Sequence, residues 1–233
     1  MNTISTLHSS RKNNNLTPFQ KLLISKPTYA RYTAANYNVV TNVLKESTNN
    51  GRDATGSGIT KGVTTNNGAL ATIDYLSGSS SSKIIFPNGT IPNPYTICSL
   101  TRYSGPTYGR ILQSVEQNWL FGHWIGNRGV HYNGSWRTQQ SSVGIKNNWL
   151  NFSGTSGGIV PSNILCDGVS IGISTGSNPV VSSLSINGGL LYPGEVSDFE
   201  FSQVLIWDVV LTATEMKTVS NAIANYLATG YLN

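Results

Sequence analysis

The chain has 233 residues, of which 38% are apolar and only 11% are charged, and its net charge is +5. This length suits one large domain whose core needs neither disulfides nor metals. Ser, Thr, Asn and Gly take the place of charged residues, which disfavours long charged helices and favours short strands joined by turns. Its 11 tyrosines and 5 tryptophans exclude a disordered polar chain. No apolar run is long enough to span a membrane.

The positive charge is concentrated near the N-terminus. Six basic residues and no acidic residue precede Glu46, whereas the rest of the chain has nine basic and ten acidic residues. We therefore predict a basic arm over residues 1–27 and a single domain over residues 28–233. A basic arm can dock on an acidic surface, and a solvated tail is the alternative. The docking residues that we expect are Arg11, Lys12, Lys21 and Lys26.

Short strands separated by turns are predicted along most of the chain. The stretch 47–62 is rich in turn residues, and a Ser-rich loop at 77–82 separates two short strand candidates. Residues 95–103 alternate, with Ile97 on one face and Cys98 and Leu100 on the other. Asn-Gly and Asp-Gly pairs at 133, 167 and 187 predict hairpins. The predicted strands are 69–75, 83–86, 95–103, 109–115, 118–125, 129–132, 136–139, 149–153, 165–174, 184–186 and 200–207.

The periodicity changes near the C-terminus, where one amphipathic helix is predicted over residues 214–229. Thr212 and Glu215 form a capping-box pattern, in which an N-cap threonine is followed three residues later by a glutamate. Apolar residues follow at helical spacing, and Gly230 lies just past the end. The predicted buried face consists of Met216, Val219, Ile223, Tyr226 and Leu227.

The motifs of metal and cofactor sites are missing from the sequence. Cys98 and Cys166 form no CxxC pair, so either one disulfide or two free buried thiols is expected, and we favour the thiols. Calcium would have to use Asp53, Asp167 or Asp208, which form no acidic cluster in the sequence. Because nucleotide fingerprints and phosphate loops are also missing, we expect no metal and no cofactor.

Three segments, in this order, resemble the concanavalin A-like lectin/glucanase superfamily in its laminin G-like bacterial and viral branch. The first is 46–55 (ESTNNGRDAT), the second is 118–136, which contains NWLFGHWIG, and the third is 201–215 (FSQVLIWDVVLTATE). The resemblance covers about four fifths of the chain. It departs from the family pattern at Gln203, where Glu is usual, and at Val209–Val210, which replace a polar turn. The fold implied is a two-sheet antiparallel sandwich, or jelly roll, with one C-terminal helix.

The resemblance raises the question of catalysis, because the superfamily includes glucanases. Retaining glycosidases place two carboxylates about 5 Å apart. The family strand supplies them as E-x-D-x-x-E, whereas Glu195, Asp198 and Glu200 have the spacing E-x-x-D-x-E. Strand alternation puts Asp198 and Glu200 on one face and Glu195 on the other. We therefore expect no catalytic residues. A polysaccharide lyase stays as the rival, with candidates that lie close together in the sequence: His123, Arg128, His131, Tyr132 and Arg137.

A glycan-binding site needs fewer special features than catalysis. Aromatic rings stack on sugar rings, and Asn or Arg side chains bind the hydroxyl groups. The segment 119–137 combines both kinds of residue around glycine turns. Large aromatics in strands usually pack in the core, which is the alternative for Trp119, Trp124 and Trp207. Asn127, Arg128 and Tyr132 are expected at exposed turn positions. The predicted carbohydrate contacts are Trp124, Asn127, Arg128, Tyr132, Asn133 and Trp136.

The function predicted from these features is that of a non-catalytic, lectin-like structural protein of a virion. Residues 1–15 lack the apolar core of a signal peptide, and extracellular lectins normally carry one. Assembly of a particle takes place in the cytosol, and the basic arm would contact other subunits of a capsid or tail. Nucleic acid is not expected as the partner. The alternatives are a glycan-degrading enzyme on the same fold, a structural subunit without a ligand, and export by a non-classical route.

Overall fold

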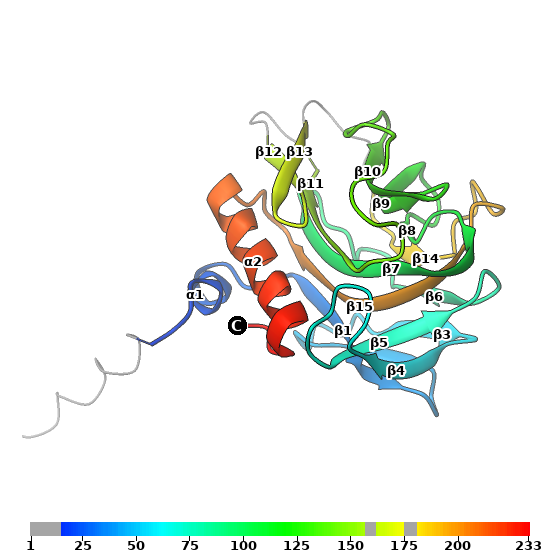
Figure 1. Cartoon of the computed structure of the whole chain (residues 1–233), viewed down its shortest axis with the longest axis horizontal. Coiled ribbons are helices and arrows are strands. Elements are labelled where there is room, and N and C mark those ends of the chain that lie inside the picture. The colour runs from blue at the N-terminus through cyan, green and yellow to red at the C-terminus, as the bar shows by residue number, and fades with distance from the viewer. Residues whose placement is uncertain (1–14, 157–161, 175–180) are drawn as a thin grey trace, which may run out of the picture.

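Strands from the whole chain join into one hydrogen-bonded sheet that folds over itself into two layers (Figure 1). The computed structural model describes residues 15–156, 162–174 and 181–233. The helices are α1 (Pro18–Ser25) and α2 (Ala213–Thr229). The strands are β1 (Ala30–Asn38), β2 (Val43–Glu46), β3 (Ala54–Ser57), β4 (Thr60–Thr64), β5 (Ile73–Gly78), β6 (Lys83–Ile85), β7 (Thr96–Tyr108), β8 (Leu112–Gln113), β9 (Trp119–Trp124), β10 (Asn127–Asn133), β11 (Leu150–Thr155), β12 (Ser162–Cys166), β13 (Val169–Ser174), β14 (Ser185–Ile186) and β15 (Ser197–Trp207).

The sheet is antiparallel at each strand pairing that the structure describes. Its order is β10-β9-β8-β14-β6-β3-β2-β1-β15-β7-β11-β12-β13, with the β4–β5 hairpin joined to β15. β15 lies at the centre and pairs with both β1 and β7, so that Ile206 is opposite Ala30 on one side and Ile97 on the other. Strands from the two ends of the chain are therefore neighbours. The architecture is the β-sandwich that the sequence predicts.

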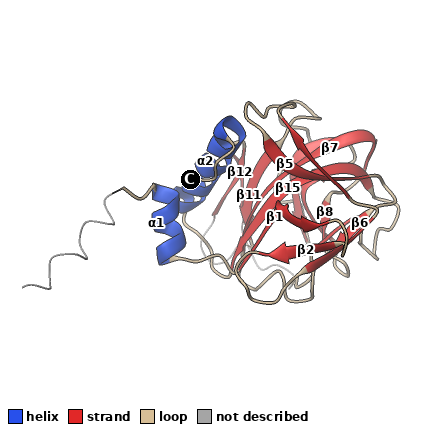
Figure 2. Ribbon diagram, turned by 90° about the horizontal axis from the view of Figure 1, so that it is seen from below, coloured by secondary structure: helices blue, strands red, loops and turns tan. Residues whose placement is uncertain are grey.

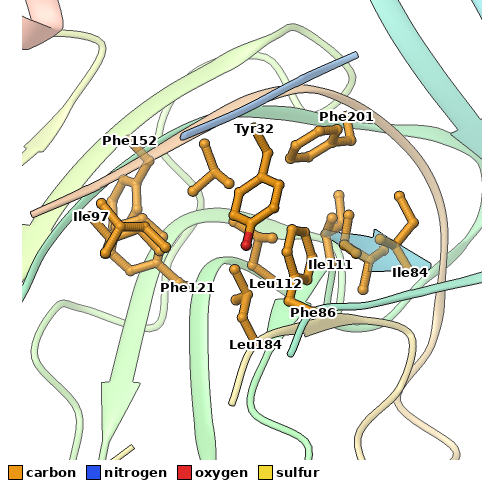
Figure 3. Close-up of a cluster of buried hydrophobic side chains, with 14 of the residues drawn as sticks. Tyr32, Ile84, Phe86, Ile97, Ile111, Leu112, Phe121, Phe152, Leu184 and Phe201 are labelled. Carbon is orange, nitrogen blue, oxygen red and sulfur yellow. The ribbon is translucent and has the colours of Figure 1, made fainter. Parts of the chain in front are cut away.

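The main core lies between the two layers. Ile97, Phe121 and Phe152 are fully buried there with Phe201, and each comes from a different strand (Figure 3). Tyr32 also lies in this core, where its ring meets Phe86 edge-on at 4.8 Å between centroids. Edge-on aromatic pairs of this kind contribute about 0.5–1.5 kcal/mol beyond the area that they bury.

A second core lies on the outer face of the β7–β15 layer, where the two helices cover it. Cys98 and Leu100 of β7 are fully buried under this cover, whereas Ile97 faces the main core, as the predicted alternation requires. Figure 2 shows α1 and α2 together on one side of the strands. The second core contains the helix residues Phe19, Leu22, Met216, Val219 and Ile223, and the sheet residue Trp207.

The C-terminal helix forms as the sequence predicts. The Thr212 hydroxyl accepts a hydrogen bond from the Glu215 backbone N–H at 3.3 Å, and the Glu215 carboxylate accepts one from the Thr212 N–H at 2.9 Å. This reciprocal pair satisfies two of the unpaired N–H groups at the start of the helix. Gly230 ends the helix with a φ of 78°, in the left-handed region that a C-terminal glycine tolerates.

Most of the predicted strands overlap an observed strand, whereas the four strands before residue 65 have no predicted counterpart. The closing strand, predicted at 200–207, is observed at Ser197–Trp207. The segment 165–174 is two strands, β12 and β13, that turn at Asp167–Gly168. The segment 136–139 contributes only an isolated bridge between Trp136 and Tyr132. Strands β1 to β4 have no such counterpart because their sequences consist mostly of small and polar residues.

The stretch predicted as an arm contains a packed helix. Phe19 and Leu22 of α1 are buried in the second core, and the Lys26 ammonium group lies 2.7 Å from the Glu215 carboxylate of α2. The Trp207 indole N–H also donates to the Lys26 carbonyl at 3.0 Å. The packed part of the chain thus begins before residue 28. Lys21 is exposed on α1, whereas Arg11 and Lys12 lie outside the described residues.

Candidate functional site

The β9–β10 hairpin carries most of the aromatic residues that the sequence singled out. Its register places Trp124 opposite Asn127, Tyr132 opposite Leu120, and His131 opposite Phe121. Facing residues in an antiparallel pair point to the same side, and successive residues point to opposite sides. Trp124, Asn127 and Tyr132 therefore share the outer face of the hairpin.

Three partly exposed aromatic rings touch on this outer face. The Trp124 and Trp136 rings lie 4.9 Å apart between centroids, tilted by 58°, and Tyr132 meets Trp136 edge-on at 5.2 Å. Trp136 comes back over the hairpin through the turn at Asn133–Gly134, where Gly134 has a φ of 68°. We call Trp124, Tyr132 and Trp136 the aromatic cluster.

Polar side chains from two other segments border the aromatic cluster. The Glu195 carboxylate accepts a hydrogen bond from the Trp124 indole N–H at 3.0 Å and also pairs with Arg110. Arg110 in turn donates to the Asn118 side-chain carbonyl at 3.0 Å and lies 4.3 Å from the centre of the Tyr192 ring. The arrangement places a carboxylate, a guanidinium and an amide beside the aromatic rings.

Apolar residues project into solvent at the edge of the same site. Leu190 and Leu191 are 71% and 54% exposed in the loop that leads to Glu195. Ile125 is 56% exposed at the tip of the β9–β10 hairpin and has a φ of 45°. A β-branched residue is strained in this left-handed region, and such strain concentrates at functional sites.

Two of the predicted carbohydrate contacts point away from the cluster. Arg128, which the sequence predicted as an exposed contact, is only 2% exposed. Its guanidinium donates to the Val143 carbonyl at 2.6 Å, to the Trp149 carbonyl at 3.0 Å and to the Asp167 carboxylate at 2.9 Å. Asn133 is 1% exposed. Both residues follow an outward-facing residue in β10, so alternation turns them inward.

The two histidines of the β9–β10 hairpin, His123 and His131, are fully buried. His131 packs edge-on against Phe121 at 5.2 Å between centroids, and His123 packs against Tyr103 at 4.7 Å. Burial, together with the nearby charge of Arg137, lowers the pKa of His131 to about 3. Burial and the charge of Arg128 likewise hold the pKa of His123 well below its usual value. Both side chains are therefore neutral at ordinary pH.

The carboxylates considered for glycoside hydrolysis each hold structural partners. Glu200 accepts two hydrogen bonds from Arg102, at 2.6 and 2.8 Å. Asp198 accepts from the backbone N–H groups of Ser80 at 2.9 Å and of Thr107 at 3.0 Å. Glu195 lies before β15 begins, rather than on that strand.

The cysteines and the candidate calcium ligands have structural surroundings. Cys98 and Cys166 are free and buried, as favoured from the sequence, and burial raises the pKa of each thiol to about 12. Asp53 pairs with Lys45, and Asp167 pairs with Arg128. Over the residues that the structure describes, no three His, Cys, Asp or Glu side chains gather in a way that could hold a metal ion. In the same residues, no helix has the length and apolar character needed to cross a membrane.

Comparisons with known proteins identify the class of fold. No protein-family model matches the sequence, and no curated protein matches it. Solved structures do match, and the likeness supports the β-sandwich fold.

Domain 4 of an extracellular arabinanase from Geobacillus stearothermophilus, solved with arabinotriose, is 16% identical with a TM-score of 0.57, over 82% of this chain and 96% of that chain. A Trypanosoma rangeli sialidase, solved with sialic acid, is 12% identical with a TM-score of 0.56, over 86% of this chain and 33% of the sialidase. The binding domain of Paraclostridial Mosquitocidal Protein 1 is 14% identical with a TM-score of 0.58, over 86% of this chain and 53% of that chain. At these identities the likeness shows the fold alone.

Sequence reasoning missed Arg110, Asn118 and Tyr192 as neighbours of the aromatic cluster, and it placed Glu195 only in a catalytic hypothesis. Arg110 and Glu195 are 85 positions apart in the chain. The Pro193–Gly194 pair indicates a turn just before Glu195. The sequence does not indicate that this turn brings Glu195 next to Arg110 and Trp124. The predicted strand 129–132 leaves Arg128 in a turn, whereas β10 begins at Asn127. A prediction that began the strand at Asn127 would have placed Arg128 on the inward face by alternation.

Proposed function

We propose that this domain is a non-catalytic glycan-binding module whose ligand lies on the aromatic cluster. One observation carries the proposal: three partly exposed aromatic rings touch each other beside the Arg110–Glu195 pair. Sugar rings present C–H faces that stack on aromatic rings, and their hydroxyl groups both donate and accept hydrogen bonds. The cluster and its polar border offer both kinds of contact.

The ligand that this border suits best is a neutral glycan. The Arg110 charge is compensated by Glu195, so this pair does not favour an acidic sugar over a neutral one. The arabinotriose bound to the structurally similar arabinanase domain is a neutral oligosaccharide and gives a first probe. Sialic acid, bound to the similar sialidase, gives the acidic counterpart.

The non-catalytic part of the proposal is supported by the surroundings of the candidate catalytic groups. His123 is fully buried, and Glu200 is engaged by Arg102. A hydrolase on this fold is the alternative, and release of reducing sugar from an oligosaccharide panel would establish it. If such release is lost in Glu195→Gln but not in Glu200→Gln, the site proposed for binding would itself be an active site.

Binding is tested by isothermal titration calorimetry of the full chain with arabinotriose and, separately, with sialyllactose. We expect arabinotriose to bind and sialyllactose to bind at least about tenfold more weakly, a difference of ~1.4 kcal/mol. Trp124→Ala and Trp136→Ala should abolish measurable binding. Tyr231→Ala, which removes an aromatic side chain that is 70% exposed elsewhere, is the matched control and should change nothing. Equal binding by all three variants would contradict the proposed site.

A place for this module in a virus particle is a further part of the proposal, and it comes from the sequence. The excess of basic residues near the N-terminus supports this role. In this proposal Arg11 and Lys12, which precede α1, attach the domain to other subunits of the particle. Deletion of residues 1–14 leaves α1 and its buried contacts intact, so this truncation separates attachment from folding. Copurification of the full chain, but not of the truncated chain, with assembled particles is the expected result. Equal incorporation of both chains would exclude anchoring by this segment.

A further inference from the structure

The ion pairs Arg102–Glu200 and Arg110–Glu195 make different numbers of hydrogen bonds. Arg102 donates from Nε to one oxygen of Glu200 at 2.6 Å and from Nη2 to the other oxygen at 2.8 Å. Arg110 donates to Glu195 from Nε alone, and only the Oε2 atom accepts. The planar guanidinium group matches both oxygens of a carboxylate, so a two-bond pair is the complete form. The Arg110–Glu195 pair is therefore half open.

The open half of this pair lies beside the aromatic cluster and reaches solvent. The Trp124 indole N–H donates to the same Oε2 atom at 3.0 Å, so two donors converge on one oxygen of Glu195. Oε1 of Glu195 and Nη2 of Arg110 have no hydrogen-bond partner among the described residues. Neither atom is closed off from solvent, in contrast to the unpartnered ring nitrogens of His131. The Glu195 side chain is 28% exposed. A donor and an acceptor are thus accessible next to Trp124.

The Arg110 side chain is held in place before any ligand arrives. Its Nη1 atom donates to the Asn118 side-chain carbonyl at 3.0 Å, and its Cζ atom lies 4.3 Å from the centre of the Tyr192 ring. The Asn118 amide in turn donates to the Tyr192 hydroxyl at 3.2 Å. The Arg110 backbone N–H also donates to the Glu195 carbonyl at 2.9 Å. A donor and an acceptor that are already fixed lower the entropic cost of binding.

The two accessible atoms narrow the class of ligand. Nη2 of Arg110 can only donate a hydrogen bond, and the ionised carboxylate of Glu195 can only accept one. Nε and Nη2 donate from the same edge of the guanidinium plane, so Nη2 lies on the side of the carboxylate. The ligand must therefore offer an acceptor and a donor close together. Two neighbouring hydroxyl groups of a sugar ring meet this need, because one can accept from Nη2 while the other donates to Oε1.

We propose that Arg110 and Glu195 bind two adjacent hydroxyl groups of one sugar unit whose C–H face lies on Trp124. The inference rests on the proposed glycan-binding function and adds to it the pattern of hydroxyl groups that the site recognises. The ligand class is a neutral glycan with two free neighbouring hydroxyl groups on the same ring. A glycan that lacks either hydroxyl group leaves one of the two protein atoms without a partner, which costs affinity.

The first test uses the natural chain and varies the ligand. In 1,5-linked arabinotriose the sugar units have free hydroxyl groups at the neighbouring carbons C2 and C3. Isothermal titration calorimetry compares this trisaccharide with its 2-deoxy analogue and with its 3-deoxy analogue. We expect each analogue to bind about tenfold more weakly, because each loses one hydrogen bond to a charged group. No residue is changed, so folding is the same in all three titrations.

The second test combines these ligands with two variants. Arg110→Lys keeps the positive charge but removes Nη2, and Arg102→Lys makes the same change in the complete pair and is the matched control. Arg110→Lys should bind arabinotriose about tenfold more weakly and should no longer distinguish it from one of the two analogues. Arg102→Lys should bind all three ligands as the natural chain does. Circular dichroism and the midpoint of thermal unfolding show whether each variant is folded.

Three results would overturn the inference and leave the proposed function intact, provided that arabinotriose binding still depends on Trp124. In the first, both analogues bind as well as arabinotriose. In the second, only one analogue is weakened, which means that a single hydroxyl group bridges Nη2 and Oε1. In the third, a folded Arg110→Lys discriminates among the ligands as the natural chain does. Absence of arabinotriose binding to the natural chain would contradict the proposed function itself, and this inference with it.

Discussion

Two outer faces of the sandwich carry tryptophans that differ in exposure to solvent. On the β7–β15 layer, Trp207 is fully buried because α1 and α2 cover it, and even its indole N–H is bonded to the Lys26 carbonyl. On the β9–β10 hairpin, Trp124 and Trp136 touch each other but remain partly exposed. The same residue type therefore stabilises the fold on one face and is free to contact a ligand on the other. The difference is the presence or absence of a covering layer.

The largest effect expected from this comparison is on stability. Trp207→Ala should lower the free energy of unfolding by about 3–5 kcal/mol, because it leaves a large cavity under the helices. Trp136→Ala should cost under about 2 kcal/mol, since it removes only two aromatic contacts of a partly exposed ring. Urea denaturation of both variants measures the difference. Equal losses would mean that Trp136 is as much a part of the core as Trp207.

Acid should affect the hairpin through its buried histidines. The pKa of His131 is lowered to about 3 in the fold, against an unfolded value near 6.5, so the unfolded chain binds the proton first. The stabilising contribution is complete above pH 6.5 and is lost as the pH falls from 6.5 toward 3. At pH 5 this one group should cost about 2 kcal/mol, and His123 should act in the same direction.

The slope of stability against pH separates this effect from simple loss of packing. His131→Phe keeps an aromatic ring in place but cannot bind a proton. Between pH 6.5 and 5 its free energy of unfolding should fall by about 2 kcal/mol less than that of the natural chain, whatever its stability at pH 7. A slope that is the same in both proteins would show that His131 accepts a proton within the fold.

The smallest effect is expected at the edge of the covered face. Lys26 joins α1 to Glu215 of α2, but its side chain is 37% exposed. Exposed ion pairs contribute roughly 0–1 kcal/mol, so Lys26→Met should lower the free energy of unfolding by less than about 1 kcal/mol. Lys21→Met, on the exposed side of the same helix, should have no effect. High salt should remove the difference between the two variants, and a larger loss would mean that α1 depends on this ion pair.

The sequence was informative wherever structure is set by neighbouring residues. The capping box of Thr212 and Glu215, the closing glycine at 230 and the alternation of Ile97, Cys98 and Leu100 are local patterns, and the structure confirms each of them. The same holds for the strand at 200–207. In these segments the hydrophobic period and the terminal residues point to one conformation, because hydrogen bonds within a turn and the spacing of apolar residues need no distant partner.

The first strands and the candidate site were decided by tertiary contacts. β1 is polar enough to resemble a loop, and it becomes a strand because it pairs with β15, with Ala30 opposite Ile206. Propensity is weak in such strands, and pairing across the sheet determines their structure. The same reason limits the prediction of the site. Trp124 and Trp136 were visible in the sequence, whereas their polar neighbours Arg110 and Glu195 come from segments that only the folded sheet brings together.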